Sequence, residues 1–556
     1  MTQNKLNMTH NFSKPFIGVL SAALLLSSCG STTIVSTPVE NIDSVPLKVS
    51  DLTTAEKEAW GHKDLITDTI PGMSVEKAYA EIVKNKKGEK IIVAVLDSGM
   101  DLEHEDLKGV LWTNTKEIPG NNIDDDNNGY IDDIHGYNFL GDSYNEQLEL
   151  TRIVAKKLGD ATTLAAAKAE LETEKNEALA NKTQYEQILQ AVTNADTAVK
   201  KQLGKETYTK EDLAGIQSTD PVIQQSVGIL TQMFNYGDSI PEVIEELNGG
   251  IKHFTESLNY NLNTDFNGRT VVGDNPYDIT DTKYGNGNPQ NMVKDESHGT
   301  HVAGIIGAER NNGKGANGVA NNVAIMSIRA VPNGDEYDKD IALGIRYAVD
   351  NGAKIINGSF GKSYSPNAEW VYDAITYAAS KGVLIVHAAG NDGKDLDDPN
   401  NPNFPNDQVN NGPEIADNVL TVGALTSKYG SEMVAGFSNY GTINVDVFAP
   451  GAAIYSTVPH NEYEFMGGTS MAAPAVAGVA ALVWSQYPKL TASQIKHIIM
   501  ESGLDTKTTV MLAGDPSKSA PFNTISTSGK MVNAYNALIL ADQVAKGKIK
   551  LNENAK

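Results

Sequence analysis

Residues 91–99 read Ile-Ile-Val-Ala-Val-Leu-Asp-Ser-Gly, an unbroken apolar run that ends in Asp97, a serine and a glycine. A continuous apolar run of this length is typical of a strand that is buried on both faces of a parallel sheet. The run therefore predicts a parallel sheet in which Asp97 stands at the end of one strand.

Short apolar segments alternate with helical patterns from His298 onward. Further strands are predicted at residues 323–331, 355–359, 383–388 and 419–424, and helices at 338–351, 365–381 and 470–487. Alternation of this kind predicts an α/β fold, with a mainly parallel sheet covered by helices on both faces.

The composition is that of an acidic globular protein. Of the 556 residues, 40% are hydrophobic and 21% charged, so a large core can be buried. The formal net charge of −25 argues against nonspecific binding to nucleic acid or anionic lipid, which needs a basic surface. The one cysteine, Cys29, excludes an intrachain disulfide and a cysteine-based zinc site.

A different kind of sequence separates Asp97 from the later strands. From Leu148 to Leu203 there is no proline, Gly159 is the only glycine, and apolar residues recur at helical spacing. This pattern predicts a helical hairpin or small bundle, continuing to about Leu262, that is inserted into the sheet domain. A structural cap and a substrate-gating lid are equal interpretations, with a partner-docking surface as a third.

Three short segments predict nucleophilic catalysis. Val95 to Asp101 holds Asp97 at a strand end, while Ser297 to Gly304 and Gly467 to Pro474 each open a helix. A serine hydroxyl becomes a good nucleophile when an imidazole accepts its proton and a buried carboxylate orients that imidazole. At a helix start, Ser470 also gains from the helix dipole as negative charge develops.

Each of these residues also has an ordinary structural interpretation. Asp97 could cap a turn, either His298 or His301 could be a hydrogen-bonded core histidine, and Gly-Thr-Ser is common in loops. For His301 the core role is preferred. The joint occurrence in the order Asp, His, Ser favours catalysis, and Ala472 excludes the Gly-x-Ser-x-Gly elbow of esterases.

These segments resemble those of subtilisin-like serine proteases, the subtilase family, over about residues 60–141 and 266–540. The resemblance implies a three-layer α/β/α fold, a triad of Asp97, His298 and Ser470, and protein or peptide substrates. Ala-Ala-Gly-Asn-Asp at 388–392 matches the family's oxyanion segment, with Asn391 as the side-chain donor. Its ordinary interpretation is a turn asparagine.

The segment Asn-Gly-Ser-Phe-Gly at 357–361 resembles the strand on which the family lays its extended substrate, with Ser359, Phe360 and Gly361 as substrate-binding residues. An ordinary strand end is the alternative. Two departures stand out: Ala475 replaces the family's usual histidine, and Asp97 and His298 are 201 positions apart. An inhibitory pro-domain is not expected between Cys29 and Leu52.

An acidic loop at residues 122–133 predicts a structural calcium ion. Oxygen ligands at alternate positions, with a glycine for the sharp turn, suit a hard cation. The predicted ligands are the side chains of Asp124, Asp126, Asn128 and Asp132 and the backbone carbonyl of Tyr130. His135 stands where an EF-hand has glutamate, so the loop is a truncated variant. A solvated acidic turn is the alternative, and the acidic run 392–407 is a weaker candidate.

The N-terminus resembles that of a bacterial lipoprotein. An apolar run at 16–26 is too short to span a bilayer and is followed by Leu-Ser-Ser-Cys, ending at Cys29. This predicts a signal peptide at 1–28, lipid (palmitate) on Cys29 and a polar tether at 29–51. An ordinary signal peptide is the alternative. Beyond it we expect a discontinuous peptidase domain at 52–141 and 266–545, the helical insertion at 142–265 and a tail at 546–556.

Together these features predict an exported serine endopeptidase, attached to a membrane of the cell envelope through lipidated Cys29 and acting on proteins or peptides. No nucleic acid partner is expected, and the sequence does not indicate the oligomeric state. One alternative is a catalytically silent surface protein that binds peptides on the same scaffold. Another is a processing enzyme with a narrow target, in which the insertion acts as a gate.

Overall fold

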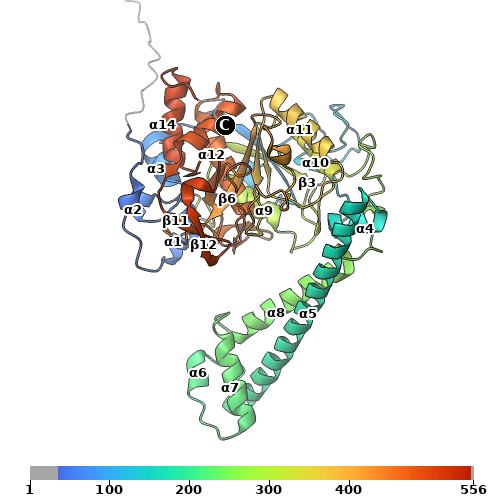
Figure 1. Ribbon diagram of the computed structural model, residues 1–556, viewed down its shortest axis with the longest axis vertical. Coiled ribbons are helices and arrows are strands. Elements are labelled where there is room, and N and C mark those ends of the chain that lie inside the picture. Colours follow the sequence, from blue (N-terminus) through green and yellow to red (C-terminus); the bar gives the residue numbers. More distant parts are fainter. Residues whose placement is uncertain (1–35, 552–556) are drawn as a thin grey trace, which may run out of the picture. The chain divides into compact units, whose positions relative to one another are not determined.

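The computed structural model describes residues 36–551, and a nine-stranded sheet covered by helices forms the body from which helices α5 to α8, residues 161–256, project (Figure 1). The strand order is β10-β13-β7-β6-β5-β4-β1-β3-β2, and all neighbours are parallel except β10 and β13. The bounds are β1 Ile91–Asp97, β2 Gly136–Asn138, β3 Val323–Arg329, β4 Ile355–Gly358, β5 Leu384–Ala388, β6 Val419–Leu425, β7 Val447–Pro450, β10 Leu504–Asp505 and β13 Lys530–Met531. The predicted parallel sheet is confirmed.

Register brings the carboxyl ends of the central strands to one edge. Leu96 of β1 pairs with Gly358 of β4, and Gly358 pairs in turn with His387 of β5. The residues that follow these strands therefore start from neighbouring positions, although the chain separates them by hundreds of residues. This edge is where open parallel sheets bind ligands.

Helices cover both faces of the sheet, as predicted. On one face, α12 (Thr469–Gln486) contacts β1, β4, β5, β6 and β7 and packs against α9 (His298–Gly307). On the other, α10 (Asp338–Asp350) and α11 (Ala368–Ser380) share an apolar cluster with Ala94 and Leu96 of β1. Because successive side chains of a strand point to opposite faces, the neighbours of Ala94 and Leu96 face α12. The fold is the predicted three-layer α/β/α arrangement.

Outer helices and hairpins complete this body. Helices α13 (Ala492–Ser502) and α14 (Ala534–Ala545) pack against α12. Two antiparallel hairpins lie outside the main sheet, β8 (Ile454–Val458) with β9 (Glu462–Met466) and β11 (Thr509–Leu512) with β12 (Asp515–Pro521). The short helices before β1 are α1 Thr54–Ala59, α2 Leu65–Asp68 and α3 Val75–Ala78.

The segment between β2 and α9 contains the predicted helices. They are α4 Glu149–Lys156, α5 Ala161–Leu203, α6 Lys210–Ala214, α7 Pro221–Met233, α8 Ile240–Glu256 and the π-helical turn η5 Ser257–Asn261. Helix α5 begins at an Asp160 cap and ends at Gly204 in the left-handed conformation. It runs beside α8 and contacts α4, α7 and η5 (Figure 1). We refer to residues 142–265 as the helical segment.

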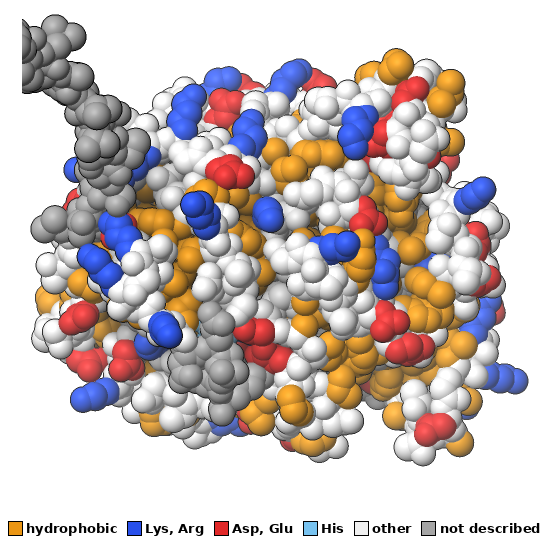
Figure 2. All heavy atoms as spheres, turned by 90° about the horizontal axis from the view of Figure 1, so that it is seen from above, with side chains coloured by type: hydrophobic (Ala, Val, Ile, Leu, Met, Phe, Trp, Pro, Cys, Tyr) orange, Lys and Arg blue, Asp and Glu red, His pale blue; other side chains and the backbone are white. Residues whose placement is uncertain are grey.

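Several predictions concern residues that lie wholly or partly outside the described part. Cys29 and the signal peptide fall outside residues 36–551. Part of the predicted tether packs on α14, because Ile42 is buried and the backbone of Val39 exchanges two hydrogen bonds with the side-chain amide of Asn536. Among the described residues, every helix is too short or too polar to span a lipid bilayer. On the face shown in Figure 2, acidic, basic and apolar side chains are interspersed.

Candidate active site

Asp97 and His298 meet at the carboxyl edge of the sheet. Asp97 ends β1, and His298 is the first residue of α9. A hydrogen bond of 2.6 Å joins His298 Nδ1 to Asp97 Oδ1. Glycine at 299 permits this approach, since a Cβ there would lie 2.6 Å from the carbonyl oxygen of Ser98. The two predicted residues are thus brought together across 201 positions of chain.

The electrostatics of this pair favour a charged imidazole. The Asp97 side chain is 1% exposed and that of His298 is 37% exposed. Burial lowers the pKa of His298, but the ionised Asp97 and its hydrogen bond more than offset this, so the pKa lies above its usual value of 6.5. An imidazole held this way accepts a proton more readily than a free one.

Ser470 approaches the same edge from α12. It is the second residue of that helix, so its hydroxyl lies at the positive end of the helix dipole. The hydroxyl donates to the carbonyl oxygen of Ser359 at 3.2 Å, and Ser359 Oγ donates to the carbonyl oxygen of Ser470 at 2.9 Å. The Ser470 hydroxyl thus donates to Ser359 and not to His298, so this hydrogen bond must break before the hydroxyl proton can pass to His298.

Asn391 stands on the loop that follows β5, with its side chain fixed by α12. Its Oδ1 accepts hydrogen bonds from the backbone N–H of Thr469 at 2.8 Å and from Thr469 Oγ1 at 3.1 Å. This anchors the carbonyl half of the amide. The Nδ2 atom makes no hydrogen bond to the described residues, so it can donate to an oxygen in the cleft beside Ser470.

The loop around Asn391 is itself braced. Gly390 has φ of +96°, where a side chain would be strained, and its N–H donates to Thr469 Oγ1 at 3.0 Å. Buried Asn439 donates to the carbonyl oxygen of Ala389 at 2.9 Å. Asn439 also accepts from the backbone N–H groups of Asp392 and Lys394. Thr469 and Asn439 therefore hold the loop in one conformation.

The predicted substrate strand, Ser359 to Gly361, continues from β4. The carbonyl oxygen of Phe360 accepts a hydrogen bond of 2.8 Å from Nε2 of buried His387. Burial lowers the pKa of His387 to about 4, so this imidazole is neutral near pH 7. Gly361 is exposed, and its N–H and carbonyl groups bond to none of the described residues. It offers the backbone edge that strand addition requires.

A cleft of about 390 Å³ lies between these elements. Its walls come from the start of α12, the loop after β5, the segment after β4, and the helical segment. The lining residues are Leu148, Leu150, Glu170, Glu174, Asp335, Phe360, Gly361, Lys362, Ser363, Tyr364, Ala388, Gly390, Asn391, Asp392, Asn403, Thr469 and Ser470. The hydroxyl of Ser470 and the amide of Asn391 thus face a space that can hold a side chain.

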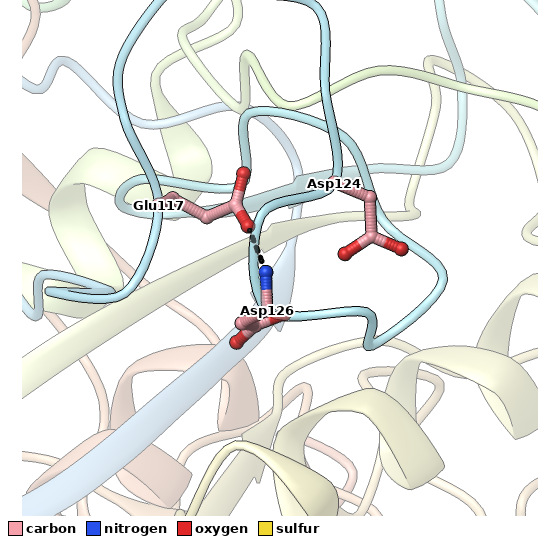
Figure 3. Close-up of side chains that lie close together, drawn as sticks. All are labelled: Glu117, Asp124 and Asp126. Carbon is pink, nitrogen blue, oxygen red and sulfur yellow. Dashed lines mark hydrogen bonds between the residues drawn. The ribbon is translucent and has the colours of Figure 1, made fainter.

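The acidic loop brings three carboxylates together (Figure 3). Oxygens of Glu117, Asp124 and Asp126 lie within 4.8 Å of one another. Glu117 accepts hydrogen bonds from the backbone N–H groups of Asp125 and Asp126, and Asp124 accepts from those of Asn128 and Gly129. Lys116 Nζ lies 3.8 Å from Asp126. Such a group of hard oxygens fits a cation such as calcium.

The other predicted ligands are placed differently. Asp132 accepts from the N–H groups of Gly120, Asn121 and Asn122, so its carboxylate closes the first half of the loop and lies outside the three-carboxylate group. Asn128 Oδ1 accepts from the N–H of Tyr130. The Tyr130 ring packs against other aromatic rings. In the acidic run 392–407, Asp397 accepts from the backbone of residues 443 and 444.

A family model described as the subtilase family, Peptidase_S8, matches residues 88–522. The chain belongs to the subtilase family. The thermophilic serine proteinase of Bacillus sp. (strain AK1) is 42% identical over 223 residues, which cover 40% of this chain and 49% of that protein. Thermitase of Thermoactinomyces vulgaris is 38% identical over 223 residues, covering 40% of this chain and 70% of thermitase. A solved protease structure from Pseudoalteromonas arctica PAMC 21717 is 31% identical, with a TM-score of 0.34, over 44% of this chain and 70% of that one.

The chain thus matches about half the length of the first of these relatives. Three features of this subtilase were not found from sequence. The orienting role of Thr469 and the bracing role of Asn439 depend on contacts between distant segments, for which one sequence carries no signal. Glu117 precedes the acidic loop by several residues and falls outside the alternate spacing on which the calcium prediction rested.

Proposed function

We propose that this subtilase is a serine endopeptidase in which Asp97, His298 and Ser470 form the catalytic triad and Asn391 stabilises the oxyanion. The observation that carries the proposal is the 2.6 Å hydrogen bond between Asp97 and His298. Ser470, at the start of the helix α12 that packs against the helix of His298, lines the cleft. A buried carboxylate that orients an imidazole, together with a serine in the first turn of a helix, is the set of groups that acyl transfer requires.

The mechanism follows from these positions. Once Ser470 Oγ turns from Ser359, His298 Nε2 accepts its proton and the oxygen attacks the peptide carbonyl carbon. The negative charge that develops on the carbonyl oxygen is stabilised by Asn391 Nδ2 and a backbone N–H at the start of α12. His298 then gives the proton to the leaving amine as the C–N bond breaks. A water molecule hydrolyses the acyl-enzyme by the same steps.

Proteins or peptides are the substrates that suit this cleft. The exposed backbone of Gly361 supports pairing with an extended peptide, and the contact from His387 holds Phe360 in place. The strand-like segment lies directly beside Ser470, because Ser359 and Ser470 exchange hydrogen bonds. A peptide laid along this segment therefore passes the nucleophile.

The test is labelling of the purified protein with a fluorophosphonate probe, with the modified residue identified by mass spectrometry. Labelling of Ser470 that is lost in Ser470→Ala and reduced in His298→Ala is the expected result. Absence of labelling in protein with an unchanged melting curve would refute the proposal and favour the silent peptide-binding alternative.

The acidic loop adds a structural calcium ion to the proposal. Glu117, Asp124 and Asp126 would hold it, since their carboxylates converge with Lys116 as the one cation in contact among the described residues. A bound cation offsets the repulsion between these carboxylates and so stabilises the loop. The catalytic steps above do not pass through the ion.

Export and lipid attachment are also proposed. The basic start, the apolar run at 16–26 and Cys29 after two small residues support a lipoprotein signal and an anchor in the cell envelope. Metabolic labelling with palmitate, compared between the natural chain and Cys29→Ala, tests this. Incorporation that persists in Cys29→Ala, or none in either protein, would contradict it.

A further inference from the structure

The helical segment forms one wall of the cleft beside the nucleophile. Leu148 and Leu150, around the start of α4, and Glu170 and Glu174, on α5, line the same 390 Å³ space as Ser470. Glu170 and Glu174 are one helical turn apart and so share one face of α5. The chain therefore places two carboxylates of a distant segment next to the reacting centre.

The charge in this cleft is predominantly negative. Besides Glu170 and Glu174, Asp335 and Asp392 contribute carboxylates. Among the described residues that line the cleft, Lys362 is the only cation. Its ammonium group is already bound by Glu149 at 2.7 Å and Asp338 at 2.9 Å, both buried. Its charge is therefore compensated within the wall and does not offset the carboxylates that face the cleft.

The protonation behaviour of Glu174 agrees with this charge distribution. Burial, followed by the negative charges of Glu170 and Asp335, raises the pKa of Glu174 to about 7, although the exposed Lys394 acts in the opposite direction. An ionised Glu174 is thus poorly compensated in the unliganded protein. A cation entering the cleft would relieve that repulsion.

Both carboxylates are held in place by packing. The hydroxyl of Tyr364, another cleft residue, donates to Glu170 Oε2 at 2.6 Å. Ala167 and Leu171 of α5 are buried against Leu150 and Ile153 of α4. Tyr364, which follows β4 in the α/β body, packs against the same cluster, so this part of α5 is held beside the cleft that Glu170 and Glu174 line.

We propose that Glu170 and Glu174 make the cleft selective for a lysine or arginine side chain on the residue whose carbonyl group Ser470 attacks. The inference rests on the proposed endopeptidase function and specifies its substrate class. That residue is the relevant one because the cleft is bounded by the nucleophile, the oxyanion donor Asn391 and the substrate strand at Gly361. A long basic side chain can reach the two carboxylates from there.

The experiment measures kcat/KM for peptides that differ only at this residue: lysine, arginine, norleucine and glutamate. The natural protein is expected to prefer the basic peptides over norleucine by at least about tenfold, because half-buried charge pairs are stronger than exposed ones. In E170Q/E174Q this preference should fall by about tenfold, because kcat/KM for the basic peptides falls much more than that for the norleucine peptide. E172Q, which changes an exposed glutamate on the same helix, is the matched control.

The possible outcomes distinguish a failure of the proposed selectivity from a failure of the proposed endopeptidase function. Efficient cleavage with no basic preference, or a preference that survives in E170Q/E174Q, overturns the selectivity and leaves the endopeptidase intact. A preference lost equally in E172Q assigns the effect to overall charge and also overturns the inference. Failure of all peptides together with no fluorophosphonate labelling of Ser470 overturns the proposed function itself. E174K, which should favour the glutamate peptide over the lysine peptide, provides a second readout if E170Q/E174Q folds poorly.

Discussion

Replacing Thr469 with valine tests how far catalysis depends on the orientation of the Asn391 amide, because the amide itself is kept. Thr469 Oγ1 accepts from the N–H of Gly390 at 3.0 Å and donates to Asn391 Oδ1 at 3.1 Å. Valine has nearly the same shape but neither of these hydrogen bonds. The backbone N–H of Thr469, which donates to Asn391 Oδ1 at 2.8 Å, remains. The amide of Asn391 would then keep one of its two anchors.

The size of the effect follows from these contacts. Two lost hydrogen bonds at about 1 kcal/mol each, one of which leaves a partly buried N–H without a partner, lower the free energy of unfolding by roughly 2–3 kcal/mol. Complete loss of such an oxyanion donor costs about 2.7–4 kcal/mol in a subtilisin, a member of this family. Because one anchor persists, we expect Thr469→Val to reduce kcat by about tenfold, with KM nearly unchanged, and Asn391→Ala to reduce it more.

A double-mutant cycle on kcat provides the assay. If Thr469 acts through Asn391, Thr469→Val should lower kcat in the natural background and have almost no further effect in Asn391→Ala. Thr457→Val is the matched control, because it removes a buried hydroxyl that donates to Thr300 outside the cleft. Equal losses from Thr469→Val in both backgrounds, or an unchanged kcat in the single variant, would refute the reasoning.

Three further outcomes are expected. Because catalysis needs neutral His298 and the pKa of His298 lies above 6.5, activity should rise with pH, with a midpoint above pH 6.5. In Asp97→Asn the midpoint of this rise should move to lower pH, and kcat should fall about 10⁴-fold. A pH–rate profile with an unchanged midpoint would contradict this. Excess chelator should lower the unfolding temperature. In the presence of calcium, Glu117→Gln should unfold at a lower temperature than the natural protein, and chelator should have no further effect on this variant. An unchanged melting curve in metal-free protein would exclude the ion. Burial lowers the pKa of His387 from 6.5 to about 4, so between pH 6.5 and pH 4 the unfolded chain binds a proton at His387 that the folded protein does not. The contribution of neutral His387 to the free energy of unfolding is therefore fully present above pH 6.5 and declines toward pH 4. His387 contributes about 3 kcal/mol of that decline, and urea unfolding of His387→Gln at pH 7 and 4.5 should show a smaller loss than the natural protein.

Much of the α/β body could be predicted because its signals are local. The strands near residues 355 and 384 are buried along their whole length, and the apolar run before Asp97 is buried except at Ile92, so their hydrophobicity is continuous. A parallel sheet places the ends of such strands at one edge. The strand assignments thus place Asp97, Ser359 and the loop before Asn391 at the same edge, while the order β5-β4-β1 that makes them neighbours is seen only in the structure.

The remaining features depend on contacts that one sequence does not encode locally. Thr469 was recognised as part of a motif, yet its hydrogen bonds to residues near 390 appear only when β5 and α12 are adjacent. In the acidic loop, alternate spacing predicts Asp132 as a ligand, and this assignment stays a prediction. Its carboxylate accepts hydrogen bonds from the backbone N–H groups of residues 120–122, which the spacing does not indicate.

The position of the helical segment has a more specific physical basis than apolar packing. Arg152 of α4 donates to Glu149 at 2.6 Å and to the carbonyl oxygen of Glu336 at 2.9 Å, and Lys362 of the cleft wall donates to the same Glu149 and the same carbonyl. All these charged side chains are buried, where an ion pair adds little net stability but an unpaired charge costs several kcal/mol. Any displacement of α4 would leave some of these buried charges without a partner. The network therefore fixes the position of α4, and with it the acidic face of α5, relative to the segment that begins at Lys362. The buried charges that hold α4 in place therefore also fix the position of Glu170 and Glu174 beside the cleft.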